Sequence, residues 1–217
     1  GEVRHRERVS TPVGDYVATL DSVVALVERL ERQCGQACSV GVGTPGALSP
    51  HDGRLRNSNS TCLNGQTLHL DLGRRLDRPV RIANDANCFA LSEAQDGAAH
   101  DARSVFGVIL GTGTGGGVVI DGRLVDGPNA IAGEWGHNPL PWPTDDERPG
   151  LRCYCGRRGC IETFLSGPGL AADYPGGTAV TAKQVADRAA TGEASATACL
   201  QRYEDRLARS LATVINL

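Results

Sequence analysis

The sequence predicts an α/β protein, because short apolar segments typical of strands alternate with longer segments in which apolar residues recur at helical spacing. The alternation occurs twice, once in residues 16–99 and again from residue 104 onward. A chain of 217 residues, 40% of them hydrophobic, is long enough for one large domain or two small ones. We therefore expect a smaller α/β domain at residues 1–97 and a larger one at residues 98–217.

The first elements follow from local patterns. Residues 1–10 alternate apolar with charged side chains and predict a strand. Asp15 is a suitable N-cap for the next segment, whose helical periodicity extends to Gly35, a residue typical of helix C-termini. A short buried strand is predicted at residues 39–43. It runs into the turn Thr44-Pro45-Gly46, whose backbone groups can face a cleft.

A polar segment at residues 57–65 contains more amides and hydroxyls than a connector requires. Two interpretations are equally favoured: a loop that contacts a ligand, or a surface loop rich in Asx turns. A short helix is predicted at residues 68–76, because Leu68, Leu72 and Leu76 form one apolar stripe.

The next strand, at residues 79–83, ends in Asn84 and Asp85, where a helix extending to about Ala99 begins. Open α/β sheets place their ligand-binding groups at the carboxyl ends of strands, which makes Asp85 a candidate functional residue. The alternative is a simple N-cap, a position at which aspartate is common.

A glycine-rich segment follows the apolar strand predicted at residues 104–110. Glycines and interleaved threonines at residues 111–117 let backbone N–H groups and hydroxyls approach phosphate oxygens closely. The segment is not a Walker loop, because no lysine follows, and a second strand at residues 118–120 with a hairpin at Asp121-Gly122 excludes a dinucleotide fingerprint. We favour phosphate contact over a hairpin without a ligand.

The thiols with metal-ligand spacing are Cys153, Cys155 and Cys160. Zinc requires a fourth donor, for which His137 is the candidate, while buried or disulfide-linked thiols are the alternative. Glu134 lies three residues before His137, and Glu162 lies two residues after the last cysteine. A structural Zn²⁺ would hold these two acids in a fixed relation, which suits a polyhydroxylated ligand.

The C-terminal third is predicted to be helical. Residues 161–170 begin a helix, Thr181 caps a short helix, and a last helix starts near Glu193. Its apolar stripe, suited to covering the sheet of the second half, consists of Leu200, Tyr203, Leu207, Leu211 and Val214.

Composition excludes several functions. A formal net charge of −3, a pI near 6.0 and the lack of a basic run argue against nucleic acid or an acidic membrane surface as a partner. No apolar run is long enough for a membrane span, and residues 1–8 are too charged for a signal peptide. Of the 8 cysteines only three cluster, which favours a reducing, cytoplasmic location.

Taken together, Asn84-Asp85, the segment at residues 111–117, Glu134-x-x-His137 and the cysteine cluster followed by Glu162 resemble a ROK-family sugar kinase over nearly the whole chain. The resemblance implies an actin-like ATPase (ribonuclease H-like) fold, with a hexose and ATP with Mg²⁺ as ligands. It further implies that Asp85 is the catalytic base. The residues expected to bind the sugar are Asn84, Glu134, His137, Glu162, Gly43, Pro45, Gly46 and Asn59. Those expected to bind the nucleotide are Gly111, Thr112, Gly113, Thr114, Gly115, Gly116, Gly117 and Val118. His137 is expected to serve also as a ligand of structural Zn²⁺, with Cys153, Cys155 and Cys160.

Within the family, the amino-acid sequence of residues 57–65 and 133–142 is similar to that of the bacterial fructokinase (mannofructokinase) branch. We therefore expect fructose to be converted to fructose 6-phosphate. Glucokinase and N-acetylglucosamine kinase of the same family are alternatives, and Cys62 stands where that branch is expected to have tryptophan. A sugar-sensing transcriptional repressor of the family is a further alternative, although a sensor has no need of the base Asp85. A zinc-stabilised interaction module without a ligand would leave the glycine-rich segment without a purpose.

Family kinases open with an Asp-x-Gly-Gly-Thr phosphate loop and continue with a Gly-Gly-Gly segment near the adenosine. Neither segment is present, and the chain contains no Met, so we interpret residues 1–217 as lacking the first phosphate loop and the last nucleotide-binding elements. Expressed alone, this stretch should transfer little or no phosphate. The family also leads us to expect a homodimer.

Overall fold

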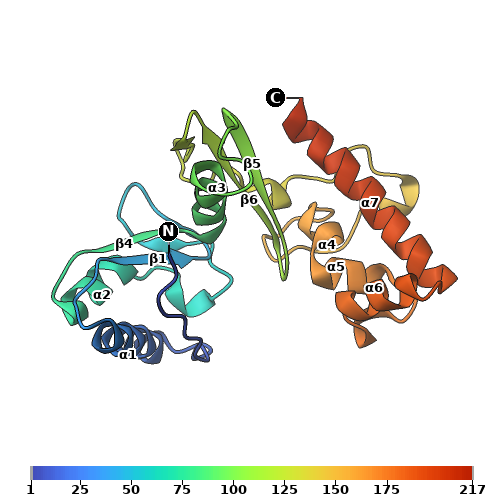
Figure 1. Ribbon diagram of the computed structural model, residues 1–217. Helices are drawn as coiled ribbons and strands as arrows, with labels where there is room; N and C mark the ends of the chain where they lie inside the picture. The colour runs from blue at the N-terminus through green and yellow to red at the C-terminus, as the bar shows by residue number, and fades with distance from the viewer. Residues whose placement is uncertain (1, 217) are drawn as a thin grey trace. The chain divides into compact units, whose positions relative to one another are not determined.

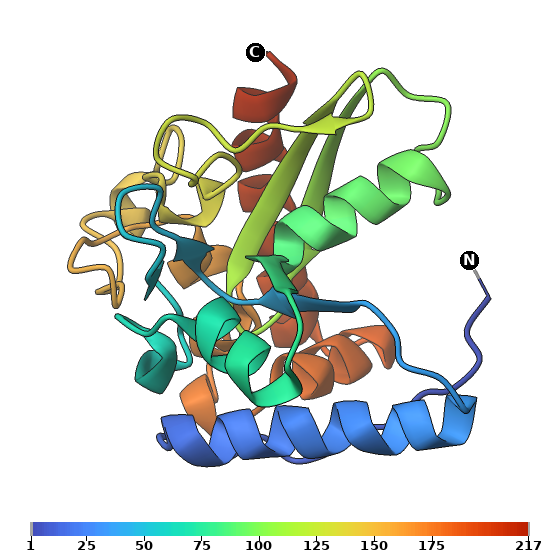
Figure 2. The same cartoon turned by 90° about the vertical axis from the view of Figure 1, so that its left-hand side faces the viewer.

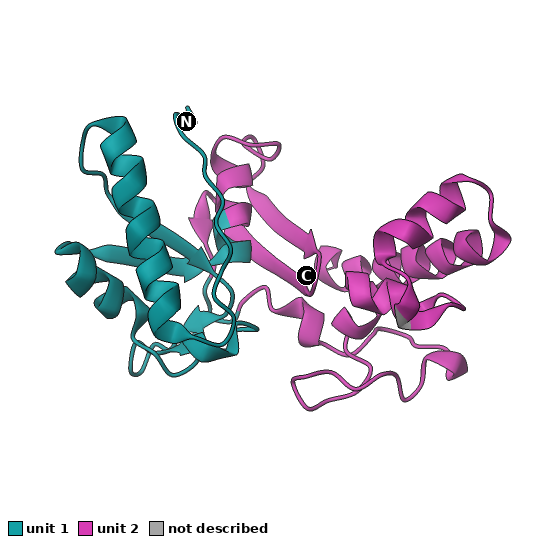
Figure 3. Ribbon diagram, turned by 90° about the horizontal axis from the view of Figure 1, so that it is seen from below, with its two compact units in different colours: residues 1–88, 126–131 teal, residues 89–125, 132–217 magenta. Residues whose placement is uncertain are grey.

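A computed structural model describes residues 2–216, with only the backbone of Thr178, and confirms the α/β class (Figure 1). The chain divides into two compact units, one of residues 1–88 and 126–131, the other of residues 89–125 and 132–217 (Figure 3). The boundary falls within helix α3 (Asp85–Gln95). The domains expected at 1–97 and 98–217 stay a prediction, because compactness alone does not define a domain.

The first unit is built on two parallel strands, β1 (Val40–Thr44) and β4 (Val80–Asn84). Helices α1 (Tyr16–Cys34) and α2 (Leu68–Leu76) lie on one side of these strands (Figures 1 and 2). The apolar stripes read from the sequence form their common core, because Leu20, Leu68 and Leu72 are all buried. Two short antiparallel strands, β2 (Ala47–Leu48) and β3 (Leu55–Arg56), and the 3₁₀ turn η1 (Thr61–Leu63) complete the unit.

Helix α1 begins and ends as predicted. The Asp15 carboxylate accepts a hydrogen bond from the N–H of Ala18 at 3.0 Å, and Gly35 closes the helix with φ of 71°. The strand predicted at residues 1–10 is wrong for residues 2–10, which are irregular, whereas Gly1 lies outside the described residues. Val3 is 66% exposed and Val9 38%, so their alternation with charged residues buries no apolar face that would hold a strand in place.

The second unit contains the antiparallel strands β5 (Ser104–Leu110), β6 (Thr114–Ile120) and β7 (Arg123–Leu124). Side chains alternate between the two faces of a strand, so Val105 and Val119 face α3 while Phe106 and Val108 face α7 (Ala194–Ile215). Figure 2 shows α3 in front of the β5–β6 hairpin and α7 behind it. The predicted hairpin after β6 is confirmed, because Asp121 and Gly122 both have positive φ.

Three shorter helices join this sheet to α7: α4 (Glu162–Leu165), α5 (Gly167–Asp173) and α6 (Ala182–Ala190). Thr181 caps α6 together with Gln184, and Val185 is fully buried, as predicted. The stripe of α7 was expected to cover the sheet of the second half, and its residues Tyr203, Leu207, Leu211 and Val214 do share a core with Phe106 and Val108 of β5. Leu200 instead packs into a separate core between α5, α6 and α7.

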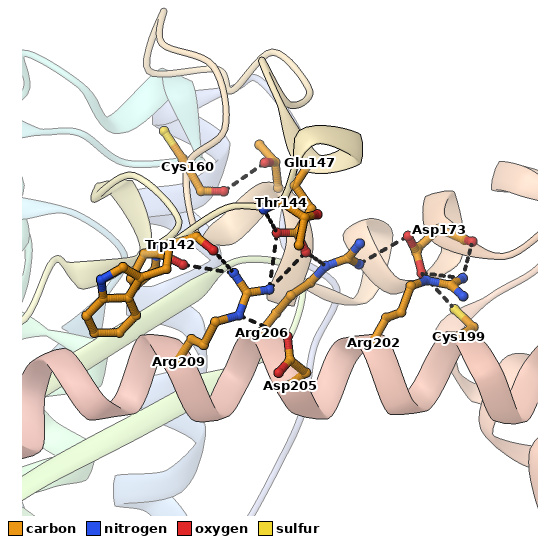
Figure 4. A network of polar contacts seen from close by, with 12 residues as sticks. Trp142, Thr144, Glu147, Cys160, Asp173, Cys199, Arg202, Asp205, Arg206 and Arg209 are labelled. Atoms are coloured by element: carbon orange, nitrogen blue, oxygen red, sulfur yellow. Dashed lines mark hydrogen bonds and ion pairs between the residues drawn. The ribbon is translucent and has the colours of Figure 1, made fainter.

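Buried charges tie α7 to the loop that precedes the cysteines (Figure 4). Arg206 reaches Glu147, in the 3₁₀ turn η3 (Asp145–Glu147), at 2.7 Å, and Asp173 of α5 at 3.1 Å. Arg209 reaches Glu147 at 2.9 Å and donates to the backbone carbonyl of Trp142 at 2.8 Å. Arg202 adds a contact of 2.8 Å to Asp173. We call Glu147, Asp173, Arg202, Arg206 and Arg209 the carboxylate–arginine network.

Among the described helices, none combines the length and apolar character needed to cross a membrane.

Candidate active site and metal centre

In the first unit, Asn84 joins the end of β4 to the turn after β1. Its Nδ2 donates to the carbonyl of Gly46 at 3.0 Å, and its Oδ1 accepts from the N–H of Asn87 at 3.1 Å. The N-cap of α3 is therefore Asn84. Asp85 is the first residue of the helix, and its exposed carboxylate accepts only the adjacent N–H of Ala86, at 2.9 Å, among the hydrogen bonds described for it. Asp85 is therefore not the cap of this helix, and its role as a functional carboxylate stays a prediction.

The turn at Gly46 requires glycine. Its φ is 83°, and a Cβ there would lie 2.4 Å from the carbonyl oxygen of Arg56. At Gly43 a Cβ would meet the Cys88 thiol at 3.6 Å, an ordinary contact. The backbone of the predicted sugar-binding turn is thus fixed by close packing, while the roles of Gly43, Pro45 and Gly46 stay predictions.

The polar segment at residues 57–65 is largely internally bonded. The side chain of Asn64 accepts from the N–H of Ser58 at 2.8 Å and donates to its carbonyl at 3.0 Å. Cys62 packs against the core of the first unit. Asn59 is exposed, and its role in sugar binding stays a prediction. The interpretation as a self-closing Asx-rich loop therefore accounts for Asn64.

The glycine-rich segment is only in part a loop. We expected residues 111–117 to form one, but only residues 111–113 turn, and Thr114 already begins β6. The glycines in the strand permit close packing: a Cβ on Gly116 would lie 2.8 Å from the ring of Phe106. Likewise a Cβ on Gly133 would lie 2.3 Å from the Gly116 carbonyl, and one on Gly136 only 2.0 Å from the Thr114 carbonyl. The glycines therefore bring the Glu134–His137 segment onto β6.

A cavity of about 450 Å³ lies beside the remaining turn. Gly111 and Thr112 form one wall, and the Gly111 carbonyl accepts a hydrogen bond of 2.7 Å from the N–H of Gly167. Its other walls come from α5 and the start of α6: Gly167, Pro168, Ala171, Val180, Thr181, Ala182 and Lys183. Sequence reasoning missed these residues, because they are far from the turn along the chain and form no motif of their own.

The four predicted metal ligands come together in the second unit. Their donor atoms all lie within 4.8 Å of one another, and we call His137, Cys153, Cys155 and Cys160 the metal-ligand cluster. The Nδ1 atom of His137 lies 3.5 Å from the Cys153 sulfur, and the sulfurs of Cys155 and Cys160 are 3.6 Å apart. A zinc tetrahedron with Zn–S bonds of about 2.3 Å requires roughly 3.8 Å between sulfurs. The cluster therefore fits Zn²⁺, and all of its cysteines are free thiols instead of disulfides.

The chemistry of the thiols also fits a cation. Burial raises the pKa of the Cys160 thiol to about 12 and raises that of Cys153. Buried thiols of this kind stay protonated near neutral pH unless a cation compensates the thiolate charge, and a coordinating metal deprotonates them outright. Metal binding here must therefore release protons.

Glu162 connects this cluster to β6. It is the first residue of α4, its Oε2 accepts the N–H of Thr114 at 3.0 Å, and its Oε1 lies 3.9 Å from the Cys153 sulfur. Glu134 begins the 3₁₀ turn η2 (Trp135–His137), and the indole N–H of Trp135 donates to the carbonyl of Gly115 at 2.8 Å. Both predicted acids are thus held on one framework with the metal ligands.

One residue of this framework was missed. Tyr154 lies between two ligand cysteines, and its hydroxyl is 3.0 Å from Nε2 of His137. Partial burial and the negative charges of Glu162 and Glu134 raise the pKa of Tyr154 to about 12. The only signal in the sequence was its place inside the cysteine cluster, which by itself does not distinguish a contact residue from a spacer.

Three comparisons bear on this site. A family model described as "ROK family" matches residues 1–217. An N-acetyl-D-glucosamine kinase of Pectobacterium atrosepticum is 42% identical over 98% of this chain and 72% of its own length. A ROK hexokinase from Thermus thermophilus is 29% identical with a TM-score of 0.79, over 96% of this chain and 68% of its own. A ROK-family glucokinase from Streptomyces griseus, solved with glucose and AMPPNP, is 26% identical with a TM-score of 0.77, over 96% of this chain and 70% of its own.

Proposed function

The chain belongs to the ROK family, and from that premise we propose that this ATP-dependent sugar kinase phosphorylates N-acetylglucosamine. The observation that carries the choice of sugar is the 42% identity to an N-acetyl-D-glucosamine kinase over 98% of the chain. A second such kinase, from Photobacterium profundum, is 40% identical over 96% of the chain. These relatives support the N-acetylglucosamine alternative better than the fructokinase expected from the sequence.

In the first unit, we assign the role of general base to Asp85. Phosphoryl transfer to a hydroxyl requires positioning of the reactants and an acceptor for the hydroxyl proton. The Asp85 carboxylate is exposed at the start of α3, and Asn84 holds that position through its bonds to Gly46 and Asn87. Because the transition state is loose, the proton can leave late, and an ordinary carboxylate basicity is sufficient.

In the second unit, we assign sugar binding to Glu134, His137 and Glu162. Carboxylates accept charge-assisted hydrogen bonds from sugar hydroxyls, and an imidazole N–H supplies a donor to a hydroxyl oxygen. When bound to the metal-ligand cluster, Zn²⁺ supplies rigidity and fixes the orientation of the His137 ring. The segment from Cys153 to Glu162 is then rigid and holds the Glu162 carboxylate in a fixed position.

The nucleotide is assigned to the turn at residues 111–113 and the adjoining cavity. Backbone N–H groups of a glycine-rich turn suit phosphate oxygens, and a volume of about 450 Å³ accommodates part of a nucleotide. Mg²⁺ on the nucleotide neutralises phosphate charge. We extend the predicted nucleotide site from residues 111–118 to Thr181 and Lys183 on this basis.

Fructose is the second candidate substrate. The specific observation in its favour is the amino-acid sequence of residues 57–65 and 133–142, which resembles that of the fructokinase branch. Cys62, the departure from that branch, packs against the core of the first unit. We therefore expect a substitution at this position to change the packing of that core more than the binding of a sugar.

The test compares kcat/KM of the complete protein for N-acetylglucosamine, fructose, mannose and glucose. The rate with each sugar is measured as the release of ADP. We expect N-acetylglucosamine to give the highest value and Asp85→Asn to lower kcat by at least about 100-fold, the scale of general-base catalysis. If fructose gives the highest value, the proposed substrate is wrong but the proposed reaction, ATP-dependent phosphorylation of a sugar, still stands. No ADP release with any of the four sugars would contradict the proposal.

A further inference from the structure

The imidazole of His137 uses its two nitrogens differently. Nδ1 faces the Cys153 sulfur at 3.5 Å, and Nε2 faces the Tyr154 hydroxyl at 3.0 Å. A histidine that ligates a metal through Nδ1 carries its proton on Nε2. Nε2 is therefore a hydrogen-bond donor, and the phenol oxygen of Tyr154 accepts from it. This same N–H is the donor that the proposed function assigns to a sugar hydroxyl.

The Tyr154 side chain is placed to move without disturbing the metal-ligand cluster. Its ring meets the imidazole edge to face, with centroids 5.1 Å apart and an interplanar angle of 86°, yet the residue is 68% exposed. Its backbone is fixed between two ligand cysteines, whereas rotation about its side-chain bonds carries the ring into solvent. Such a rotation gives up one edge contact and one hydrogen bond, a modest free energy.

The phenol reproduces the chemistry of a sugar hydroxyl. Glu134 and Glu162 only accept hydrogen bonds, so a hydroxyl that donates to either of them still needs a donor for its oxygen. His137 Nε2–H supplies that donor, and it has a single proton to give. A hydroxyl of Tyr154 and a hydroxyl of the sugar therefore compete for the same N–H.

We propose that Tyr154 gates the sugar site: its hydroxyl holds Nε2 of His137 in the free protein and is exchanged for a sugar hydroxyl on binding. The inference rests on the proposed function, because it takes His137 as a sugar-binding residue. It makes Tyr154 a determinant of sugar affinity. Since Tyr154 leaves the imidazole before the transition state, its hydroxyl affects binding and not the chemical step.

The test uses Tyr154→Phe in the complete, zinc-loaded protein. Removing the competing hydroxyl should lower the dissociation constant of N-acetylglucosamine by about three- to tenfold, the value of one hydrogen bond, and leave kcat within about twofold. Tyr203→Phe is the matched control, because its hydroxyl donates to the Leu165 carbonyl away from the cluster, and its sugar affinity should be unchanged. The zinc content of all three proteins is measured to show that the cluster is intact.

A second readout does not depend on turnover. In the free protein with ¹⁵N-labelled histidine, Tyr154→Phe should shift the Nε2 resonance of His137 and leave those of the other four of the 5 histidines in place. An unshifted His137 resonance, or sugar affinity that is equal or weaker in Tyr154→Phe, would overturn the gate while the kinase assignment stands. A wild-type protein that binds none of the four sugars would overturn the proposed function and the gate together.

Discussion

Two polar clusters in the second unit, the carboxylate–arginine network and the metal-ligand cluster, satisfy their groups in opposite ways. The carboxylate–arginine network pairs every acid with a guanidinium, as Glu147 with Arg206 and Arg209. The metal-ligand cluster brings together four metal donors, such as the sulfurs of Cys155 and Cys160 at 3.6 Å. Its described side-chain contacts beyond the ligands are with the Tyr154 hydroxyl and the Glu162 carboxylate, neither of which carries positive charge. We therefore interpret the carboxylate–arginine network, whose charges compensate one another, as structural. The metal-ligand cluster needs an added cation to compensate its thiolates.

The difference extends to what each cluster presents. The network tethers η3 and α5 to α7, and it adds the Trp142 carbonyl through Arg209. The metal-ligand cluster presents Glu162 and the Nε2 side of His137. We therefore expect loss of the first to cost stability and loss of the second to cost sugar binding.

Replacing a metal ligand should give the largest effect. Cys155→Ser is expected to reduce the zinc content from about one per chain to near zero and to lower kcat/KM for the sugar by more than about 100-fold, because ligand loss uncouples the segment carrying Glu162. Elemental analysis and initial rates measure both. Cys38→Ser, an exposed thiol outside the cluster, is the matched control and should retain zinc and rate. A normal zinc content in Cys155→Ser would contradict the assignment of Cys155 as a metal ligand, and with it the distinction between the two clusters.

Breaking the network should come next, and it should affect stability alone. Glu147→Gln removes the carboxylate that Arg206 and Arg209 share and leaves Arg206, only 7% exposed, with Asp173 as its one described carboxylate partner. We expect this to lower the free energy of unfolding by about 3 kcal/mol, the low end of the range for breaking a buried pair. Urea unfolding measures the change. Zinc content and KM, measured well below the unfolding transition, should stay within about twofold of wild type. Loss of zinc in this variant would show that the two clusters are not separate.

The acid dependence of the network sharpens the same comparison. Burial favours the protonated form of Glu147, but hydrogen bonds from Arg209 and Arg206 outweigh it and lower its pKa from 4.5 to about 2. A depressed folded-state pKa means that this stabilisation is present above about pH 4.5 and is lost as the pH falls toward 2. The stability difference between wild type and Glu147→Gln should therefore be constant at neutral pH and shrink below pH 4.5. A difference that grows on acidification would contradict the assignment.

The smallest effect is expected at Asp205, which lies outside the five network residues, at their exposed edge. Asp205 contacts Arg209 at 2.9 Å, but its side chain is 67% exposed, and exposed pairs contribute about 0–1 kcal/mol. Asp205→Asn should change the free energy of unfolding by no more than about 0.5 kcal/mol. A larger loss, measured beside Glu147→Gln under the same conditions, would mean that the edge and the centre of the network act as one unit.

The two clusters also differ in how well sequence predicts them. Three of the four metal ligands lie within eight residues, and their donor chemistry restricts the partner to a cation, so spacing alone predicted a site whose atoms the structure brings together. The pairing of Glu147 with Arg206 joins residues 59 positions apart in the sequence, and neither carries a motif. Charged residues are common, and their partners are decided by tertiary packing, so this network could not be predicted.

The same contrast applies to the fold. Helices α1, α2, α6 and α7 were predicted from their periodicity and caps, which are local properties. The first half of β6 was not, because glycines at Gly115–Gly117 read as a loop, and only the packing of Gly133 and Gly136 against that strand explains them. The contact of Tyr154 with His137 was missed for a related reason, since it depends on where the His137 ring points.

The most direct test follows zinc and turnover in the same samples. The complete protein is depleted of metal with a chelator in steps and then restored with Zn²⁺, while zinc per chain and kcat/KM for N-acetylglucosamine are measured at each step. We predict that activity falls in proportion to the zinc removed and returns with it, because the role we propose for the metal-ligand cluster is to hold His137 and Glu162 in place for the sugar. Full activity in a protein that holds no zinc would contradict the account.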